Sequence, residues 1–216
     1  MPARTLLAAA IVSGLVSLPG HAQTAPASPR FYVGLGANML SNVPFKDQGM
    51  VPRLVGPALT AGMQFTPRLA GQIGVSYQWK KDTYPANFLD LTGYFVNSVT
   101  YRYSYLIVPV LLRFTVTAPA ERFHLDLLGG GTLLHARSYS TYAYSASGVG
   151  PAEQSVNSDT RYNLTLGPSV RAALSPRLEL TASGLVSARL GENYYRFSDR
   201  LFLNTSLGIN YTFGQR

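Results

Sequence analysis

The sequence predicts an all-β protein, a closed up-and-down antiparallel β-barrel of eight strands. Apolar and polar residues alternate with a period of two in eight segments, which is typical of strands with one apolar face. The connections between these segments are alternately tight and long, as in a meander whose long loops all lie at one end. Beyond residue 22 no run approaches 18 consecutive apolar residues, which excludes a helical membrane span.

The N-terminal segment is predicted to direct export and to be removed. Arg4 supplies a positive charge, Leu6 to Leu18 form an apolar stretch, and Gly20-His21-Ala22 has the small-x-small pattern of a cleavage site. A retained membrane anchor is the alternative, but this stretch is short and rich in small residues. We therefore expect a signal peptide at 1–22, a short N-terminal spacer at 23–30, the barrel at 31–213 and a C-terminal tail at 214–216.

The first three predicted strands each have one apolar face and one polar or small face. In RFYVGLGANML, Phe31, Val33 and Leu35 share one face, and Tyr32 and Gly34 lie on the other. The apolar faces of the next two strands are Val55, Leu59, Ala61, Met63 and Phe65 in residues 54–65, and Leu69, Ile73, Val75, Tyr77 and Trp79 in residues 69–80.

Five more strands complete the predicted barrel. They are expected at approximately 99–115, 122–136, 160–173, 177–190 and 201–213. In the last strand Leu207, Ile209 and Tyr211 oppose Ser206 and Asn210, so the chain ends on a well-formed strand. The tight connections are Thr66-Pro67-Arg68, 117–121 and Ser175-Pro176, and the long ones are 40–53, 81–98, 137–159 and 191–200.

Strand length and aromatic placement favour a transmembrane barrel over a soluble one. Segments of roughly 9 to 14 residues suit a tilted crossing of the hydrocarbon layer, whereas soluble strands average about 5 to 6. A sheet in lipid must also close on itself, because an open edge would leave backbone groups without partners. Aromatic residues near both strand ends predict two interfacial girdles, with the members Phe65, Tyr77, Trp79, Tyr101, Tyr103, Phe114, Phe123, Tyr211 and Phe213.

With these features the chain resembles the small outer-membrane β-barrel domain proteins of Gram-negative envelopes, often called the porin family, which are related to the OmpA/OmpX-type barrels. The stretches that carry the resemblance are FYVGLGAN, IVPVLLRF, LDLLGGGTLL and LGINYTF. Pro109 and Arg113 match the family's Ile-Pro-Leu-Leu-Leu-Lys run, although Ile107 replaces a frequent acidic residue. Phe213 resembles the terminal aromatic that the barrel-assembly machinery recognises, although three residues follow it.

The resemblance implies an integral protein of the cell outer membrane. It implies outer-membrane lipid and lipopolysaccharide as surroundings, the barrel-assembly machinery as a partner during insertion, and no cofactor. We further expect a monomer. Rim residues such as Arg137 and Arg196 are candidates for contact with lipopolysaccharide phosphates.

The strand at 99–115 contains a conflict of phase. Unbroken alternation would place Arg102 on the lipid side together with Val108 and Val110, at a cost of up to about 2–4 kcal/mol at mid-bilayer. A bulge would turn Arg102 inward and Tyr101 outward. Because proline within a strand favours a bulge, we predict one between Leu106 and Pro109.

The inward positions are then expected to carry a polar network around arginine. Its members are Arg102, Arg113, Asp126, Arg161, Arg171, Glu179 and Arg189. Near the tight turns, Arg171 is expected to pair with Glu179, and Arg113 with Asp126. Arg102, Arg161 and Arg189 are expected to gather at the outer end without carboxylates from strands. Either this group binds anions or the network is a rigid plug that fills the lumen.

Several other functions are disfavoured by the sequence. The chain has no Cys, and after signal cleavage only His124 and His135 remain, so we expect no enzyme and no metal site. The formal charge of +8 does not indicate nucleic-acid binding, because residues 40–53, 80–98, 137–159 and 191–200 together contain seven basic and seven acidic residues. Gly129-Gly130-Gly131 is followed by neither Lys-Ser/Thr nor a predicted helix, so it is no phosphate loop.

Two functions are left open by the sequence. One is a structural or surface-interaction barrel that uses Tyr-rich extracellular loops such as Ser138 to Gly148, with a plugged lumen. The other is a narrow anion-preferring pore or a small-ligand-binding barrel. An eight-stranded barrel has an interior that side chains nearly fill, which argues against wide diffusion.

Overall fold

The computed structural model describes residues 30–42, 54–89, 95–118, 121–144, 154–191 and 201–213. The predicted signal peptide, residues 23–29 of the spacer, the C-terminal tail and Arg196 lie outside these ranges. No helix long and apolar enough to cross a membrane occurs among the described residues. All regular secondary structure within them is β-strand.

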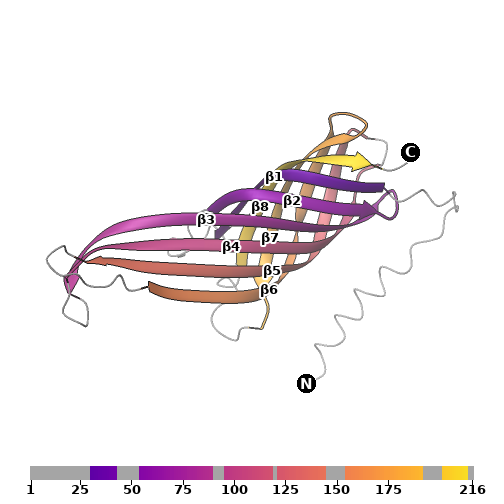
Figure 1. The fold of residues 1–216 in the computed structure, drawn as a ribbon. Coiled ribbons are helices and arrows are strands. Elements are labelled where there is room, and N and C mark those ends of the chain that lie inside the picture. The colour runs from indigo at the N-terminus through magenta and orange to yellow at the C-terminus, as the bar shows by residue number, and fades with distance from the viewer. Residues whose placement is uncertain are drawn as a thin grey trace, which may run out of the picture.

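Eight strands form one closed antiparallel barrel in the described chain, as predicted (Figure 1). Each strand pairs with the next, and the ring is closed by β1 and β8, which run side by side from Phe31↔Phe213 to Asn42↔Phe202. The strands are β1 (Arg30–Asn42), β2 (Leu54–Gln64), β3 (Leu69–Leu89), β4 (Phe95–Thr115), β5 (Phe123–Tyr144), β6 (Gln154–Ala173), β7 (Leu178–Arg189) and β8 (Leu201–Phe213).

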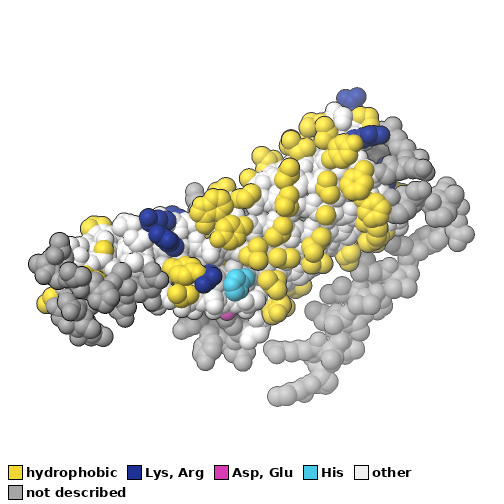
Figure 2. All heavy atoms as spheres, viewed as in Figure 1, with side chains coloured by type: hydrophobic (Ala, Val, Ile, Leu, Met, Phe, Trp, Pro, Cys, Tyr) yellow, Lys and Arg dark blue, Asp and Glu magenta, His cyan; other side chains and the backbone are white. Residues whose placement is uncertain are grey.

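The barrel is apolar outside and polar inside. On the outer side Leu35 is 70% exposed and Leu112 is 58% exposed, whereas on the inner side Asp126 and Asn163 are 1% and 2% exposed. Hydrophobic side chains form a broad band over the outer surface (Figure 2). This distribution is the reverse of that in a soluble barrel, and it fits a barrel that spans a bilayer, where the surrounding medium is lipid.

Four of the strands extend well beyond the other four. β3 to β6 have 21, 21, 22 and 20 residues, whereas β1, β2, β7 and β8 have 11 to 13. Pairing to β2 ends at Ser76 of β3, and pairing to β7 ends at Asn163 of β6. Beyond these points 77–89, 95–106, 135–144 and 154–162 form a four-stranded sheet, here called the projecting sheet (Figure 1).

The projecting sheet replaces much of two predicted loops, 81–98 and 137–159. In the second of these, residues 138–142 are Ser-Tyr-Ser-Thr-Tyr, and both Tyr and Thr have high strand propensity. Polar and aromatic residues occupy both faces along 137–142, so the contrast between apolar and polar positions is lost there. The strands therefore continue where the hydrophobic pattern ends.

The predicted bulge between Leu106 and Pro109 is wrong. Ile73↔Val110 and Ser76↔Ile107 have the same register, and pairing to β5 is continuous through Pro109. Gly74 is the residue that makes this possible, because a Cβ there would lie 3.0 Å from Pro109 Cγ. The bulges lie instead farther out, at Pro85/Phe88 in the β3–β4 pair and at Val96/Ser98 in the β4–β5 pair.

The unbroken register reverses the predicted orientation of one short segment. Arg102 is exposed on the outward side of β4, so it does not belong to the lumen network. Tyr101 and Tyr103 share the inward side with buried Ile107, so they do not belong to the outer aromatic girdle. Outward Arg102 avoids the cost of lipid contact because it lies on the projecting sheet, beyond the apolar band.

The interior near the short-turn end of the barrel is packed tightly around Tyr32. The Tyr32 hydroxyl donates a hydrogen bond to Gln72 Oε1 at 3.1 Å, and the Arg113 guanidinium lies 4.6 Å from the Tyr32 ring centroid. A Cβ added to Gly62 on the neighbouring strand would overlap the Tyr32 ring. Tyr32 is held on three sides, so it cannot move aside without losing these contacts.

Replacement of Gly62 tests this packing. Gly62→Ala is expected to destabilise the barrel by about 1–3 kcal/mol through overpacking. The matched control is Gly131→Ala on the lipid side, where the nearest atom to the new Cβ is 4.0 Å away, and it is expected to be neutral or slightly stabilising. Urea unfolding in lipid vesicles measures both variants. Equal stability of Gly62→Ala and Gly131→Ala would contradict the packing described.

Candidate functional site

The lumen contains a buried ion cluster at its short-turn end, centred on Arg171 of β6. Its Nε donates to Asp126 Oδ2 at 2.5 Å, its Nη1 donates to Glu179 Oε2 at 3.0 Å, and its Nη2 donates to Thr115 Oγ1 at 3.2 Å. Thr115 Oγ1 in turn donates to Asp126 Oδ1 at 2.7 Å. The predicted Arg171–Glu179 pair is therefore present, and Asp126 joins it.

Arg113 has a different environment from the one predicted. It is 5% exposed and lies over the Tyr32 ring, and no carboxylate of the described residues forms an ion pair with it. Its Nε is buried without a hydrogen-bond partner in the described part of the chain. The predicted Arg113–Asp126 pair is absent because Arg171 already binds both oxygens of Asp126.

Apolar and polar layers alternate along the lumen from the ion cluster toward the projecting sheet. The inner face of β5 passes from Asp126 to Leu128, Thr132 and Leu134. Leu128 packs with Leu111 and Leu185, and Leu134 packs in a second cluster with Leu40 and Ile107. Both clusters consist of side chains that are at most 6% exposed.

Hydrogen-bonded polar side chains also link the strands on the inner side of the barrel. Thr165 Oγ1 lies 2.7 Å from Thr132 Oγ1 and 2.7 Å from Ser187 Oγ, so three strands are linked. Asn38 connects two further strands, because its Nδ2 donates to Asn204 Oδ1 and its Oδ1 accepts from Gln78 Nε2, both at 2.5 Å. The interior of the barrel is thus occupied by side chains that bind one another.

The predicted group of three arginines at the outer end is incomplete. Arg102 is on the outward face of the sheet, whereas Arg161 and Arg189 are both on the inward face, with Arg189 opposite Asn163, two residues from Arg161. Arg161 is paired with Asp159 of its own strand, so a strand carboxylate is present where none was expected. The anion site predicted from three arginines on one face therefore lacks one of its members.

The inner face of the projecting sheet carries a cluster that was not predicted, here called the tyrosine face. Tyr101 stacks on Tyr103 with ring centroids 6.2 Å apart, and Tyr84 contacts Tyr101 edge-on at 6.1 Å. Lys80 and Asp82 form an ion pair of 2.8 Å on the same face, and this hydrogen bond raises the pKa of Lys80. The tyrosine face consists of Tyr84, Tyr101, Tyr103 and Tyr142, whereas Tyr105 on the same side packs against the Leu40–Ile107–Leu134 cluster in the lumen.

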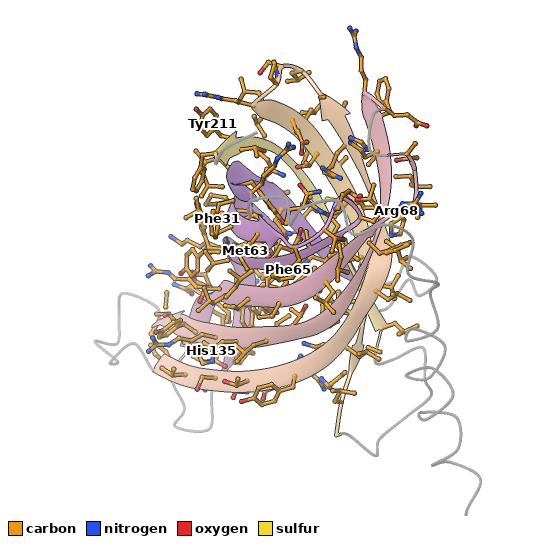
Figure 3. The ribbon with its side chains drawn as sticks, turned by 90° about the vertical axis from the view of Figure 1, so that its right-hand side faces the viewer. Phe31, Met63, Phe65, Arg68, His135 and Tyr211 are labelled. Carbon is orange, nitrogen blue, oxygen red and sulfur yellow. The ribbon has the colours of Figure 1, made fainter. Side chains whose placement is uncertain are left out.

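Two sets of aromatic residues lie on the outer surface, one at each end of the apolar band. Phe31 and Phe213 stack at the short-turn end with centroids 6.0 Å apart, and Phe31 and Tyr211 lie on the outer side of their strands (Figure 3). Tyr77 and Trp79 stack at the other end at 5.7 Å. The exposed members of the predicted girdles are Phe65, Tyr77, Trp79, Phe114, Phe123, Tyr211 and Phe213.

Neither histidine of the described chain lies beside a nucleophile and a base. His135 Nδ1 is 2.8 Å from Thr160 Oγ1 on the outward side of β5, whereas Ser138 and Ser140 are on the inward side. His124 Nδ1 is 3.4 Å from Thr117 Oγ1. The described residues contain no group of three or more His, Asp or Glu side chains that would hold a metal ion.

Comparison with known proteins identifies the fold. No protein-family model and no curated protein sequence matches the chain. A major outer membrane protein of Thermus thermophilus matches in structure with a TM-score of 0.56 and 14% identity, over 86% of this chain and 99% of that one. The chain has the fold of a small outer-membrane β-barrel.

Two further outer-membrane proteins with known structures are similar. Ail, the attachment invasion locus protein of Yersinia pestis, has a TM-score of 0.49 and 15% identity, over 88% of this chain and 100% of Ail. OprG of Pseudomonas aeruginosa has a TM-score of 0.44 and 10% identity, over 90% of this chain and 100% of OprG. At such identities the likeness concerns the barrel fold.

Replacement of Arg171 tests the ion cluster. Arg171→Leu leaves Asp126 buried without its cation, which is expected to cost about 3–5 kcal/mol of unfolding free energy. Arg171→Leu/Asp126→Leu is expected to be more stable than Arg171→Leu alone, because the fully buried carboxylate of Asp126 is then no longer left without its cation.

The matched control for this prediction is the exposed pair. Arg161→Leu breaks a pair whose side chains are 35% and 47% exposed, and it is expected to cost at most about 1 kcal/mol. Urea unfolding in vesicles measures all three variants. A loss for Arg171→Leu no larger than that for Arg161→Leu would contradict a structural role of the cluster.

Proposed function

We propose that the protein is an outer-membrane barrel whose lumen is closed. The protein binds a polypeptide partner outside the cell through its projecting sheet. The proposal includes export by a cleaved signal peptide, insertion by the barrel-assembly machinery, and a monomeric barrel in lipid and lipopolysaccharide. The tyrosine face is the observation that carries it. Four tyrosines on one face of a sheet beyond the apolar band have no role in crossing the membrane.

The chemistry of the tyrosine face suits contact with a protein. Tyrosine offers a large amphipathic contact area and loses little conformational entropy on binding, because it has only two side-chain torsions. Tyr84 and Tyr101 share this face with the Lys80–Asp82 pair, so apolar ring area and charged groups occur together. Aromatic residues such as tyrosine are enriched in protein-binding surfaces.

The edges of the projecting sheet also favour a polypeptide partner. Residues 155–160 of β6 pair with β5 but with no other strand of the described chain. Their outer backbone N–H and C=O groups can pair with an added strand. The opposite edge, in β3, is less open, since Pro85 lacks an N–H and Lys80 and Lys81 add charge. We therefore assign strand addition to the β6 edge.

The layered interior supports a closed lumen. An ion crossing the barrel would have to pass the Leu111–Leu128–Leu185 cluster and the Leu40–Ile107–Leu134 cluster, each of which offers no polar group to replace water. In the polar layer between them, Thr132, Thr165 and Ser187 bind one another. These contacts favour a plug over a conducting path.

A narrow anion-preferring pore is the alternative function, and one observation favours it. Ser76 Oγ, Gln78 Oε1, Arg113 Nε and Asn163 Oδ1 are buried without hydrogen-bond partners in the described chain. Internal water would satisfy them, and a chain of such waters near Arg113 is where an anion path would begin.

Conductance in planar bilayers separates these two functions. The folded, inserted wild-type protein is expected to give no reproducible single-channel steps, because two apolar layers interrupt the lumen. Folding is checked by the heat-dependent shift of its mobility in gels. Anion-selective steps that disappear in Arg113→Gln would establish the pore in place of the plug.

Binding to immobilised proteins tests the tyrosine face. Vesicles that carry the protein are applied to an array of serum and extracellular-matrix proteins and to an array of glycans. Saturable binding is expected on the protein array, and Tyr84→Ser/Tyr101→Ser/Tyr103→Ser is expected to weaken it at least about tenfold, since aromatic residues dominate binding energy.

The matched control for the binding test lies on the other face of the same sheet. Tyr162→Ser changes an outward tyrosine that is 64% exposed and lies outside the edge residues 155–160, and it is expected to leave binding unchanged. Absence of saturable binding, binding on glycans alone, or equal binding by wild type and the tyrosine variant would contradict the proposed role.

A further inference from the structure

The outward face of the projecting sheet has a composition that changes steadily with distance from the barrel. Side chains that face each other across β3, β4 and β5 form successive rows, which the pairing of the strands defines. From the barrel outward these rows are Val75–Val108–Leu133, Tyr77–Leu106–His135, Trp79–Ser104–Arg137 and Lys81–Arg102–Tyr139. The surface therefore passes from aliphatic to aromatic to basic over four rows, as at a membrane interface.

The basic end of this surface has no compensating acid in the described chain. Lys81 and Arg102 are directly opposite each other, and like charges in such a pair destabilise a sheet. The acids nearest in sequence, Asp82 and Asp159, are on the inward face, where they bind Lys80 and Arg161. The outward positive charge is thus available to an external anion.

These residues also line a hollow. Its volume is about 400 Å³, and its lining residues include Trp79, Lys81, Arg102, Ser104 and Tyr139. The Arg137 guanidinium lies over the Tyr139 ring at 4.6 Å, which holds this cation beside the hollow. Lys and Arg side chains are visible next to the end of the hydrophobic band (Figure 2).

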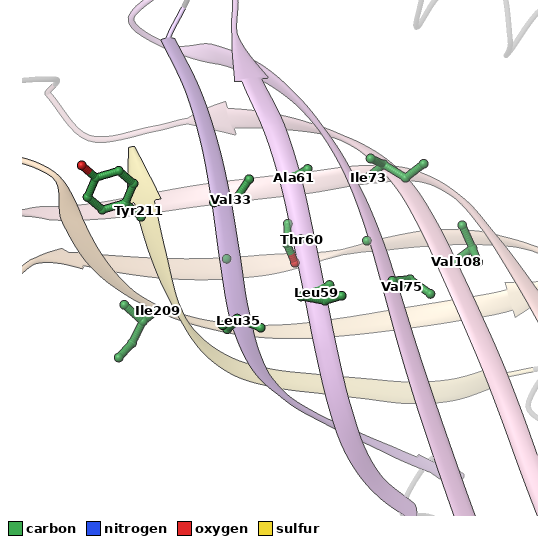
Figure 4. Close-up of a pocket in the computed structure, with 12 residues that line it drawn as sticks. Val33, Leu35, Leu59, Thr60, Ala61, Ile73, Val75, Val108, Ile209 and Tyr211 are labelled. Carbon is green, nitrogen blue, oxygen red and sulfur yellow. The ribbon is translucent and has the colours of Figure 1, made fainter. Parts of the chain in front are cut away.

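An apolar groove lies on the barrel wall two rows nearer the centre of the membrane. It has a volume of about 980 Å³ and runs across β8, β1, β2 and β3 to β4 (Figure 4). Val75 and Val108, the row below Tyr77 and Leu106, form one side of it. A molecule with its head in the hollow can therefore lay acyl chains along β3 and β4 into this groove.

We propose that Lys81, Arg102 and Arg137, here called the basic patch, bind the phosphate groups of a lipid headgroup in the outer leaflet. The hollow admits a phosphorylated sugar headgroup of the lipopolysaccharide type, with Ser104 and Thr141 as additional hydroxyl donors. This inference rests on the proposed placement of the projecting sheet outside the outer membrane. It assigns lipid to the outward face and the protein partner to the inward one.

The chain contains its own reporter for this binding. Trp79 is the single tryptophan of the sequence and lines the hollow. Folded protein in micelles of a zwitterionic detergent is titrated with lipid A that carries two phosphates, and its tryptophan emission is recorded. Saturable change is expected, with weaker binding at high salt because exposed charges are screened. Dephosphorylated lipid A and inorganic phosphate are titrated in parallel.

Two triple variants, each of which removes three positive charges, distinguish a specific phosphate site from long-range attraction between the protein and the anionic lipid. Lys81→Gln/Arg102→Gln/Arg137→Gln is expected to weaken binding about a hundredfold, from about tenfold or less per basic residue. Arg68→Gln/Arg122→Gln/Arg177→Gln removes three exposed arginines at the short-turn end, and it is expected to bind like wild type. Heat-modified gel mobility verifies that both variants are folded.

Three results would overturn the inference. Equal weakening in both triple variants would indicate long-range attraction without a site. Binding of dephosphorylated lipid A as tight as that of the phosphorylated form would remove the role of phosphate. Saturation by inorganic phosphate at the same concentration as lipid A would make the patch a site for free anions.

The same variants keep this inference separate from the proposed function. The basic-patch variant is expected to bind the protein array normally, and the Tyr84→Ser/Tyr101→Ser/Tyr103→Ser variant is expected to bind lipid A normally. Lipid binding without any protein binding would refute the proposed partner and leave the basic patch standing. Protein binding without any lipid A binding would refute the basic patch and leave the proposed protein partner standing.

Discussion

The closed ring of backbone hydrogen bonds is the constraint on which the rest of the structure depends. In lipid every N–H and C=O group needs a partner within the protein, so the sheet must have no edge. The pairing of β1 with β8 over Phe31 to Asn42 removes the last edge, and this explains why the chain needs a full strand near its end. Closure also sets the inside and the outside, because alternate residues must face lipid or lumen.

Closure with eight strands makes the interior narrow, and this decides what the barrel can do. Inward side chains of neighbouring strands contact one another, as Thr165 of β6 contacts both Thr132 of β5 and Ser187 of β7. Buried Arg171 is compensated there by two carboxylates, Asp126 and Glu179, whereas buried Arg113 lies over the Tyr32 ring. The projecting sheet escapes these limits, because water satisfies its edges and both of its faces are free to carry binding groups.

The parts of the fold that were predictable are those that lipid imposes. Alternation in 69–76 or 201–213 has strong apolar contrast, so strand number, topology and closure follow from the sequence. The extension of β3 to β6 was missed because water on both faces removes that contrast. The error at Pro109 has a non-local cause, since the relief comes from Gly74 on another strand. Asp126 pairs with Arg171 and not with Arg113, and this too depends on three-dimensional geometry that the sequence pattern does not contain.

Lys80 and Lys81 show how the alternation of side chains along a strand can separate two binding surfaces. They are adjacent in sequence and point to opposite faces, so Lys80 binds Asp82 beside the tyrosine face while Lys81 joins Arg102 on the other side. All described acids of the projecting sheet lie on its inward face, which leaves that face internally balanced and the outward one positive. A balanced, aromatic surface suits a protein partner, whereas an unbalanced one beside an apolar wall suits an anionic lipid. The parity of the strand, rather than any separate domain, keeps the two surfaces apart.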